Sequence, residues 1–314
     1  MKSLFIINPA SVRQKLESIK ASLKNIFDEK VDVVVTEYQG HAEELIKSNK
    51  EDKVIFSVGG DGSFREIVNG VGKLIENNNF LINESENYIS QNNEKNTTVP
   101  SIGVLPMGSG NDFARSIFEN MDYNYILSEY SNGRWEKSSI DLGKTNEGYF
   151  VNIASIGFDA EIVHNAERYK NKKILRKFSY ILSIFYTLFH YKGIDLKVKI
   201  GKEEFNEKTL LLAVANGKYY GGGIKIAPDA NISDGFFDVY YIPMQNRMKI
   251  LFLLPKLLNG SHTKLSFVKH FTATSVYAES KDETFLLNLD GDLIPETKAS
   301  FDIIPSCLNI VTVK

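Results

Sequence analysis

The chain of 314 residues has 43% hydrophobic and 24% charged residues, which is ordinary globular usage, and it is long enough for two domains. Its formal net charge of -2 gives no overall field that would hold nucleic acid, so we expect no nucleic-acid partner. The single cysteine, Cys307, excludes a disulfide framework and a cysteine-based metal site and fits a reducing compartment, so a cytoplasmic protein is expected.

The first third of the sequence alternates short β-branched runs with amphipathic stretches. Strands are predicted at 3–8, 31–37, 53–58 and 101–106, and helices at 12–26, 41–48 and 64–75. Repeated βα units imply a parallel sheet with helices on both faces, and ligands of such sheets bind at the carboxyl ends of the strands. We expect a doubly wound nucleotide-binding α/β domain over residues 1–135.

One segment interrupts this alternation. Residues 76–98 are crowded with Asn, Glu and Ser and are poor in core-forming side chains. Since such a composition buries little apolar surface, we interpret the segment as a mobile surface insertion.

After about residue 135 the pattern changes to many short strands separated by turn residues. The strands are predicted at 137–145, 149–156, 195–201, 209–217, 235–242, 271–279, 284–291 and 299–305, with helices at 158–191 and 246–258. The spacing favours an antiparallel β-sandwich-like domain over 136–296, with residues 297–314 packing back onto the first domain. We expect a ligand cleft between the two domains.

The longest apolar stretch, FSYILSIFYTLFHY at 178–191, is well short of the ~20 residues that a membrane-spanning helix needs. We therefore expect no transmembrane segment. Lysine and arginine residues precede it, at 172, 173, 176 and 177, and Lys192 follows. Two interpretations stay open: a core helix, or an aromatic helix that rests on an anionic membrane surface.

Several common phosphate-binding and catalytic motifs are absent. There is no Gly-x-Gly-x-x-Gly after the first strand and no Gly-x-x-x-x-Gly-Lys-Ser/Thr in the sequence. The five histidines have neither zincin spacing nor a Gly-x-Ser-x-Gly partner. Dinucleotide binding of the ordinary kind, P-loop chemistry, metallohydrolysis and serine hydrolysis therefore lack support.

Two glycine-rich turns stand where strands are predicted to end. In SVGGDGSFRE a strand leads into Gly59–Gly62 and then Ser63, three residues before Glu66, which resembles a capping box. In VLPMGSGNDFARS a second strand leads through Gly108 and Gly110 towards a helix. Glycines and a helix start suit phosphate, whereas Asp61 indicates a cation or a hydrogen-bonded anchor. A tight βα turn without a ligand is the alternative for the first motif.

These residues resemble the diacylglycerol kinase catalytic-domain family, in particular its bacterial lipid kinases, and the resemblance covers nearly the whole chain. The family loop Gly-Gly-Asp-Gly-Thr appears at 59–63, and its Pro-x-Gly-Thr-x-Asn-Asp-Phe-Ala motif appears at 106–114, each with serine in place of threonine. The segments IDLG, GFDA, GGGIKIAPDANISDGFFDV and NLDGD follow in order. Two departures are Val12, where the family has glycine, and Asp292, where the family motif Asp-Gly-Glu has glutamate.

The resemblance implies an ATP site against the two turns and Mg²⁺ bridging the phosphate oxygens. The nucleotide-binding residues that it implies are Asn8, Thr36, Gly59, Gly60, Asp61, Gly62, Ser63, Glu66, Gly108, Ser109 and Asn111. The acids that would seat the ATP-bound Mg²⁺ through waters are Asp61, Asp112 and Asp141.

The resemblance also implies that Asp292 is the base that deprotonates the acceptor, with Asp290 beside it as a metal or orienting ligand. A side chain one methylene shorter than glutamate has less reach, and a base must come within about 2.6–3.2 Å of the proton that it takes. A structural Mg²⁺ would be held by backbone carbonyls at Asn231, Asp234 and Phe236. An ordinary turn at residues 233–235 is an alternative explanation of the same sequence.

The function that follows is transfer of the γ-phosphoryl group of Mg-ATP to a lipid hydroxyl at the inner face of the membrane. Diacylglycerol is the first acceptor, and phosphatidylglycerol or another glycerolipid is an alternative. A nucleotide- or lipid-binding relative without kinase activity, or a kinase of a soluble acceptor such as NAD, remains open, as does a homodimer.

Overall fold

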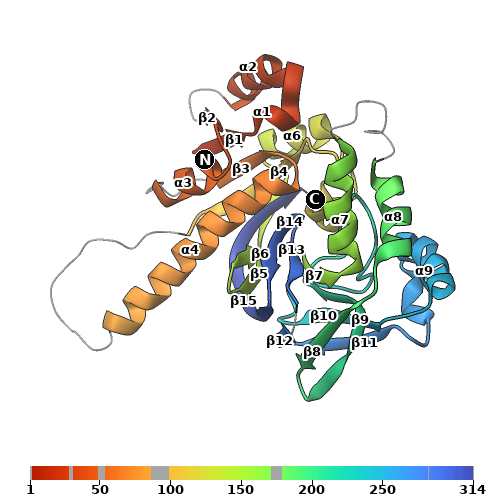
Figure 1. Ribbon diagram of the computed structural model, residues 1–314. Helices are drawn as coiled ribbons and strands as arrows, with labels where there is room; N and C mark the ends of the chain where they lie inside the picture. Colours follow the sequence, from red (N-terminus) through yellow and green to blue (C-terminus); the bar gives the residue numbers. More distant parts are fainter. Residues whose placement is uncertain are drawn as a thin grey trace. The chain divides into compact units, whose positions relative to one another are not determined.

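The computed structural model describes residues 2–27, 31–48, 54–85, 99–170, 179–281 and 283–313. The chain forms two compact units (Figure 1), which are unit 1, Met1–Leu142 with Ser306–Lys314, and unit 2, Gly143–Pro305. Two strands, β5 (Trp135–Thr145) and β15 (Lys298–Val313), contribute residues to both units. The boundaries that the sequence predicts, after residues 135 and 296, lie a few residues before those of the structure.

Unit 1 contains a parallel sheet in the order β2-β1-β3-β4-β15. Its first four strands along the chain are β1 (Ser3–Ile7), β2 (Val31–Val35), β3 (Val54–Gly59) and β4 (Ser101–Pro106). All residues of β1, β3 and β4 are buried. Near-continuous runs of β-branched and apolar residues produce such strands, because helices cover both faces of a parallel sheet. The predicted α/β domain is confirmed.

The helices of unit 1 follow the strands. They are α1 (Pro9–Val12), α2 (Leu16–Phe27), α3 (His41–Ser48), α4 (Asp61–Ser85), α5 (Asp112–Ile117) and α6 (Tyr123–Ser131). In α2 the buried residues are Ile19 and Leu23, four apart on one helix face, as the sequence pattern predicts. Helix α4, the long orange helix in Figure 1, continues ten residues beyond the predicted end at residue 75. The predicted insertion at 76–98 is therefore helical as far as Ser85, and its residues 86–98 lie outside the described part.

Unit 2 is built from antiparallel pairs, and the predicted β-sandwich-like class is confirmed. Its strands are β6 (Gly148–Phe150), β7 (Ile153–Gly157), β8 (Ile194–Ile200), β9 (Glu203–Ala215), β10 (Phe237–Pro243), β11 (Lys269–Ala273), β12 (Ser275–Ser280), β13 (Phe285–Leu289) and β14 (Asp292–Glu296). Side chains alternate between two buried clusters along β10: Val239 and Tyr241 join one, and Tyr240 and Ile242 join the other.

Three helices cover the second of these clusters. They are α7 (Phe158–Lys170), α8 (Ser179–His190) and α9 (Arg247–Asn259), and Figure 1 shows α7 and α8 in green with α9 in blue. Asn165 on α7 donates a 3.1 Å hydrogen bond to the Thr187 hydroxyl on α8. Arg247 at the start of α9 donates to the Phe189 carbonyl of α8 at 2.8 Å. These bonds hold the three helices together.

Candidate functional site

The two glycine turns lie side by side at the carboxyl edge of the parallel sheet. Gly59 pairs with Pro106 where β3 and β4 end, and the Met107 N–H donates to the Gly59 carbonyl at 2.8 Å. A Cβ on Gly60 would lie 3.1 Å from the Gly108 Cα, and a Cβ on Gly108 would lie 2.4 Å from the Gly60 Cα. The backbones can touch only because neither residue has a side chain.

Asp61 connects the first turn to the second. Its Oδ1 accepts a hydrogen bond from the Phe113 N–H at 3.3 Å, and the N–H groups of Asn111 and Asp112 also point to this carboxylate. Burial raises the pKa of Asp61, and the backbone N–H groups oppose that shift. Of the two roles that the sequence leaves open, these contacts show the hydrogen-bonded anchor: Asp61 holds the N-terminus of α5 against the start of α4.

The second turn is closed by its own side chain. The Asn111 amide accepts from the Gly108 N–H at 2.9 Å and donates to the Gly108 carbonyl at 3.0 Å. Asn111 itself is left-handed, with φ 53° and ψ 44°, a conformation that Asn tolerates better than most residues. Ser109 is exposed at the tip of this closed turn. Ser109 is therefore accessible from solvent, and its role as a phosphate donor stays a prediction.

Other predicted nucleotide residues cluster at the ends of neighbouring strands. The Asn8 amide donates to the Ser63 hydroxyl at 2.8 Å, and Asn8 also caps α1 by accepting from the Ala10 N–H. The Thr36 N–H donates to the Ile7 carbonyl at 2.9 Å. These contacts bring Asn8, Thr36 and Ser63 to the edge that carries the glycine turns, because parallel strands end together.

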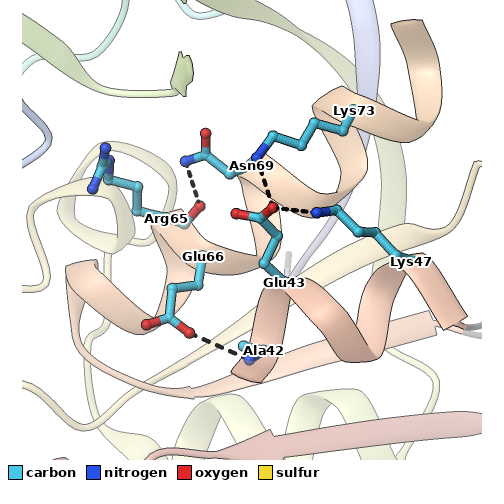
Figure 2. A network of polar contacts seen from close by, with 7 residues as sticks. All are labelled: Ala42, Glu43, Lys47, Arg65, Glu66, Asn69 and Lys73. Atoms are coloured by element: carbon cyan, nitrogen blue, oxygen red, sulfur yellow. Dashed lines mark hydrogen bonds and ion pairs between the residues drawn. The ribbon is translucent and has the colours of Figure 1, made fainter. Parts of the chain in front are cut away.

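Glu66 has a different contact from the one that the capping-box pattern predicts. Helix α4 begins at Asp61, so Ser63 lies inside its first turn, and the predicted capping box is wrong. The Glu66 carboxylate instead accepts from the Ala42 N–H in the first turn of α3, at 3.3 Å (Figure 2). Glu66 therefore holds α3 to α4 in this structure.

An ion-pair cluster at the same junction supports this contact. Glu43 of α3 accepts from Lys47 and from Lys73 of α4, both at 2.7 Å (Figure 2). Burial raises the pKa of Glu43, but the two ammonium groups outweigh it, and the pKa is lowered overall. The start of α4, which forms part of the first glycine turn, is thus fixed to α3 by a polar network.

Two of the three acids predicted to seat the nucleotide magnesium, Asp112 and Asp141, are buried in unit 1, and Asp61 is partly exposed. Asp112 is 7% exposed, and Asp141 is fully buried and accepts from the Ser306 N–H at 2.7 Å. Within the described ranges, no three His, Cys, Asp or Glu side chains converge as metal ligands. Mg²⁺ usually keeps waters and uses substrate phosphates with one or two carboxylates, so binding of the ion with ATP does not require three converging side chains. The water-linked network stays a prediction.

The predicted catalytic acids lie at a two-residue turn in unit 2. Asp290 and Gly291 connect β13 to β14 with φ values of 47° and 101°, and Leu289 pairs with Asp292 across the turn. Asp-Gly is a preferred pair for a type I′ hairpin, in which both residues have positive φ. Asp292, the first residue of β14, is half-buried beside this turn.

Asp290 acts as a backbone anchor. Its carboxylate accepts from the N–H groups of Val151, Asn152 and Ile153, at 2.9, 3.1 and 2.8 Å. These residues interrupt the single strand that the sequence predicts at 149–156, because their N–H groups bond to Asp290 instead of continuing one ladder. Asp290 thus fixes the 151–153 segment to the turn, which is the orienting contact that the structure shows for this residue.

The predicted backbone magnesium site at 231–236 has the geometry of successive tight turns. The Asn231 side chain accepts from the Ser233 N–H at 3.2 Å, and the Asp234 side chain accepts from the Phe236 N–H at 3.0 Å. Both are local side-chain turns that need no metal. The plain-turn alternative therefore accounts for the local structure, and the magnesium stays a prediction.

Helix α8 has a dual character that neither sequence interpretation describes alone. Ser183, Thr187 and Leu188 are buried, whereas Ile181, Phe185 and Phe189 are about half exposed, four residues apart along one stripe. Its predicted cationic flank at 172–177 lies outside the described residues. Within the described part of the chain, no helix is long and apolar enough to cross a membrane.

Sequence reasoning missed the apolar surface of α9. Its exposed large side chains are Met248, Leu251, Phe252 and Leu258, and Phe252 is 64% exposed. A signal was available: no Asp or Glu occurs from 239 to 278, while Arg and Lys occur five times in that range. We name the exposed residues of α8 and α9 together the α8–α9 face; its apolar atoms lie on two helices without Asp or Glu, which suits an anionic lipid surface.

Comparison with known proteins shows which protein families the chain matches. Residues 2–144 match the diacylglycerol kinase catalytic domain, and residues 152–312 match the YegS C-terminal NAD kinase beta sandwich-like domain. A diacylglycerol kinase of Staphylococcus saprophyticus is 27% identical over 291 residues, covering 93% of this chain and 85% of that protein. One of Staphylococcus aureus is 28% identical over 248 residues, covering 79% of this chain and 70% of that protein.

Solved structures agree in fold. A crystal structure of a diacylglycerol kinase from Bacillus anthracis matches with a TM-score of 0.69 and 18% identity, covering 99% of this chain and 96% of that chain. At 18% identity this similarity supports a shared fold and nothing further. The matched fold extends over both units of the chain.

Proposed function

Since the chain belongs to the bacterial diacylglycerol kinase-like family, we propose that it transfers the γ-phosphoryl group of Mg-ATP to the hydroxyl of a lipid, with diacylglycerol as the first candidate and phosphatidic acid as the product. One observation carries the proposal: the Gly60 and Gly108 backbones touch at the carboxyl edge of a parallel sheet. That edge is where α/β folds bind nucleotides. Unit 1 is the nucleotide unit in this proposal, and unit 2 is the lipid unit.

In unit 1 the phosphates of ATP would lie against the two turns. Backbone N–H groups, the Ser109 hydroxyl and the start of α4 supply donors and partial positive charge. Phosphoryl transfer needs mainly positioning and neutralisation of charge, so a rigid pair of turns suits it. Mg²⁺ would be held by the phosphate oxygens and, through waters, by Asp61, Asp112 and Asp141. The ion would neutralise charge on the phosphates.

In unit 2 Asp292 would act as the base. It would accept the proton of the lipid hydroxyl as the oxygen bonds to the γ-phosphorus and ADP leaves. Asp290 supports this role by fixing the turn that carries Asp292 to the 151–153 segment. The 231–236 segment would hold the second, structural Mg²⁺ on its carbonyls.

The lipid would be reached by peripheral binding at a membrane surface through the α8–α9 face. The face presents Phe185, Phe189 and Phe252, each at least half exposed, without an acidic residue in either helix. Aromatic and aliphatic side chains enter the interface region of a bilayer, and nearby cations attract anionic lipids.

The test is phosphorylation of a panel of acceptors by the purified chain with Mg-ATP. We expect labelled phosphatidic acid from diacylglycerol in mixed micelles, little product from phosphatidylglycerol or ceramide, and none from NAD without detergent. Asp292→Asn should lower the rate by at least about 100-fold, the usual size of a general-base effect, while ATP still raises the Tm of the variant. Asp292→Glu measures whether the shorter acid limits the rate.

Each negative result of this assay would indicate a different function for the chain. If ATP raises the Tm but no acceptor is phosphorylated, the chain is a nucleotide-binding relative without kinase activity. If NAD is phosphorylated in the absence of lipid, the acceptor class is wrong. Full activity of Asp292→Asn would remove Asp292 from the role of base.

A further inference from the structure

Unit 2 contains a cavity of about 510 Å³ beneath helices α7, α8 and α9. This volume is within the about 300–1,000 Å³ that small-molecule sites occupy. Its walls are the start of α7, Ile184 of α8, Leu210 and Leu211 of β9, the 220–224 turn and one side of α9 from 253 to 258. Most of the lining side chains are Leu, Ile or Phe, so the cavity suits a hydrocarbon chain better than a polar metabolite.

One acid lines this apolar cavity. Asp159 is 7% exposed, and its Oδ2 accepts from the Ser155 hydroxyl at 2.5 Å. Its Oδ1 makes no hydrogen bond of good geometry with the protein. Burial raises the pKa of Asp159, against hydrogen bonds from Ser155 and the α7 backbone. The carboxylate oxygens of Asp159 accept hydrogen bonds, so this residue is the acidic acceptor in an otherwise largely apolar wall.

Asn288 joins this acid to the turn that carries the proposed base. The Asn288 amide oxygen accepts from the Gly291 N–H at 2.9 Å, and the amide nitrogen donates to Asp159 Oδ2 at 3.5 Å. Asn288 therefore links Asp159, in the cavity wall, to the Asp290–Asp292 turn. A lipid whose polar end lies at Asp159 would have its head group near that turn.

The cavity reaches the α8–α9 face. Leu258 lines the cavity and is also 63% exposed, and the half-buried Ile184 lies on α8 one residue before the exposed Phe185. The same two helices thus form a wall of the cavity and an apolar outer surface. A chain that leaves a bilayer at this face would pass from one apolar environment to another.

We propose that the cavity holds an acyl chain of a glycerolipid taken from an anionic bilayer at the α8–α9 face, and that Asp159 and Asn288 position the polar end of that lipid beside the Asp290–Asp292 turn. The proposal rests on the lipid kinase function proposed above and names how the lipid is recognised. Diacylglycerol fits because it brings acyl chains to the cavity and, at its polar end, a hydroxyl that can donate to a carboxylate.

The first test fills the cavity. Ile184→Trp should weaken binding of pyrene-labelled diacylglycerol in detergent micelles, without ATP, by about tenfold, because the larger side chain would occupy volume that the acyl chain needs. Val163→Trp, at a half-buried position on α7 that does not line the cavity, is the matched control and should bind like the wild type. Leu254→Trp repeats the test from α9, and thermal unfolding verifies that each variant folds.

The second test concerns positioning. Asp159→Leu should raise the KM for diacylglycerol about fivefold or more and leave the KM for ATP unchanged, because loss of one hydrogen bond costs about 1 kcal/mol. Asp159→Asn keeps the shape and an acceptor oxygen and should restore most of the affinity. A merely structural role would change both KM values together.

The outcomes of these tests distinguish failure of the cavity proposal from failure of the proposed kinase function. If Ile184→Trp and Leu254→Trp bind and phosphorylate diacylglycerol like the wild type, the cavity proposal is wrong and the kinase function stands. If the wild type binds the labelled lipid and the two variants do not, but no lipid is phosphorylated, the cavity stands and the function fails. Binding lost equally in Val163→Trp, or a concentration-dependent dimer that hides the α8–α9 face, would overturn the cavity proposal.

Discussion

Unit 1 and unit 2 present opposite chemistry to a ligand. At the edge of the parallel sheet in unit 1, two turns meet through bare backbone at Gly60 and Gly108. In unit 2 the walls of the cavity are aliphatic and aromatic side chains with a single acid, Asp159. A triphosphate needs donors and positive potential, whereas an acyl chain needs only the absence of water. In the proposed function, unit 1 would therefore hold ATP and unit 2 would hold the lipid.

The two units are alike in how they use a carboxylate. Asp61 holds the start of α5 through the Phe113 N–H, and Asp290 holds the 151–153 segment through three N–H groups. Both acids belong to motifs that the sequence associates with magnesium or catalysis. Their contacts show that an acid in such a motif can act first by fixing backbone, which positions other groups for the chemistry.

The largest effect should follow from separating the two turns of unit 1. In Gly108→Ala the new Cβ would lie 2.4 Å from the Gly60 Cα, a clash with backbone that neither turn can relieve by a side-chain rotation. A displacement near 1 Å at a reacting centre can lower a rate by about 100-fold. We expect at least that loss in phosphoryl transfer, and loss of the ATP-induced rise in Tm.

Gly62→Ala distinguishes a clash within the protein from a clash with the ligand. No heavy atom lies within 4 Å of a Cβ at this position, so the fold should accept it. Any loss of ATP binding in Gly62→Ala then reports the nucleotide itself. If Gly108→Ala binds ATP like the wild type, contact between the turns is not what builds the site.

A smaller effect, on stability, should follow from removing the anchor of unit 2. Asp290→Gly removes the carboxylate and accepts the positive φ of 47° without strain, so it isolates the loss of the three hydrogen bonds. Leaving these N–H groups without their partner should lower the free energy of unfolding by about 2–4 kcal/mol in urea titrations. Asp292→Asn, two residues away, should change it by less than about 1 kcal/mol. Equal losses in the two variants would contradict the division between anchor and base.

The sequence predicts the strands and the nucleotide edge well for a physical reason. Runs such as 54–59 and 101–106 are apolar, β-branched and followed by glycine, and parallel strands must end at the same edge. Local patterns therefore place Gly60 near Gly108. The end of α4 is less predictable, because Asn and Glu after residue 75 have low apolar content yet continue the helix to Ser85.

Contacts between distant residues were not predictable. Ser63 and Glu66 have capping-box spacing, but which partner Glu66 takes depends on where α3 packs, and in the structure that partner is the Ala42 N–H. The cavity of unit 2 is built from ordinary hydrophobic residues of α7, α8, β9 and α9. No short motif marks them, since only the folded chain brings them together.

The smallest effect should come from the ion pairs that fix α3 to α4, and it shows whether the nucleotide edge depends on them. Glu43→Gln should lower the free energy of unfolding by about 0.5 kcal/mol at pH 7, since both lysines are more than 40% exposed. The pKa of Glu43 is lowered on folding, so its contribution is present above the ordinary value of 4.5 and is lost as pH falls through the folded value. The difference from wild type in urea titrations should therefore decrease as the pH falls below 4.5, and it should also decrease in high salt. ATP binding by Glu43→Gln should equal that of the wild type, because Asp61 and the glycine contact hold the turns. A loss of ATP affinity at pH 7 without further loss of stability would mean that the α3–α4 junction, and not the contact between the turns alone, sets the geometry of the edge.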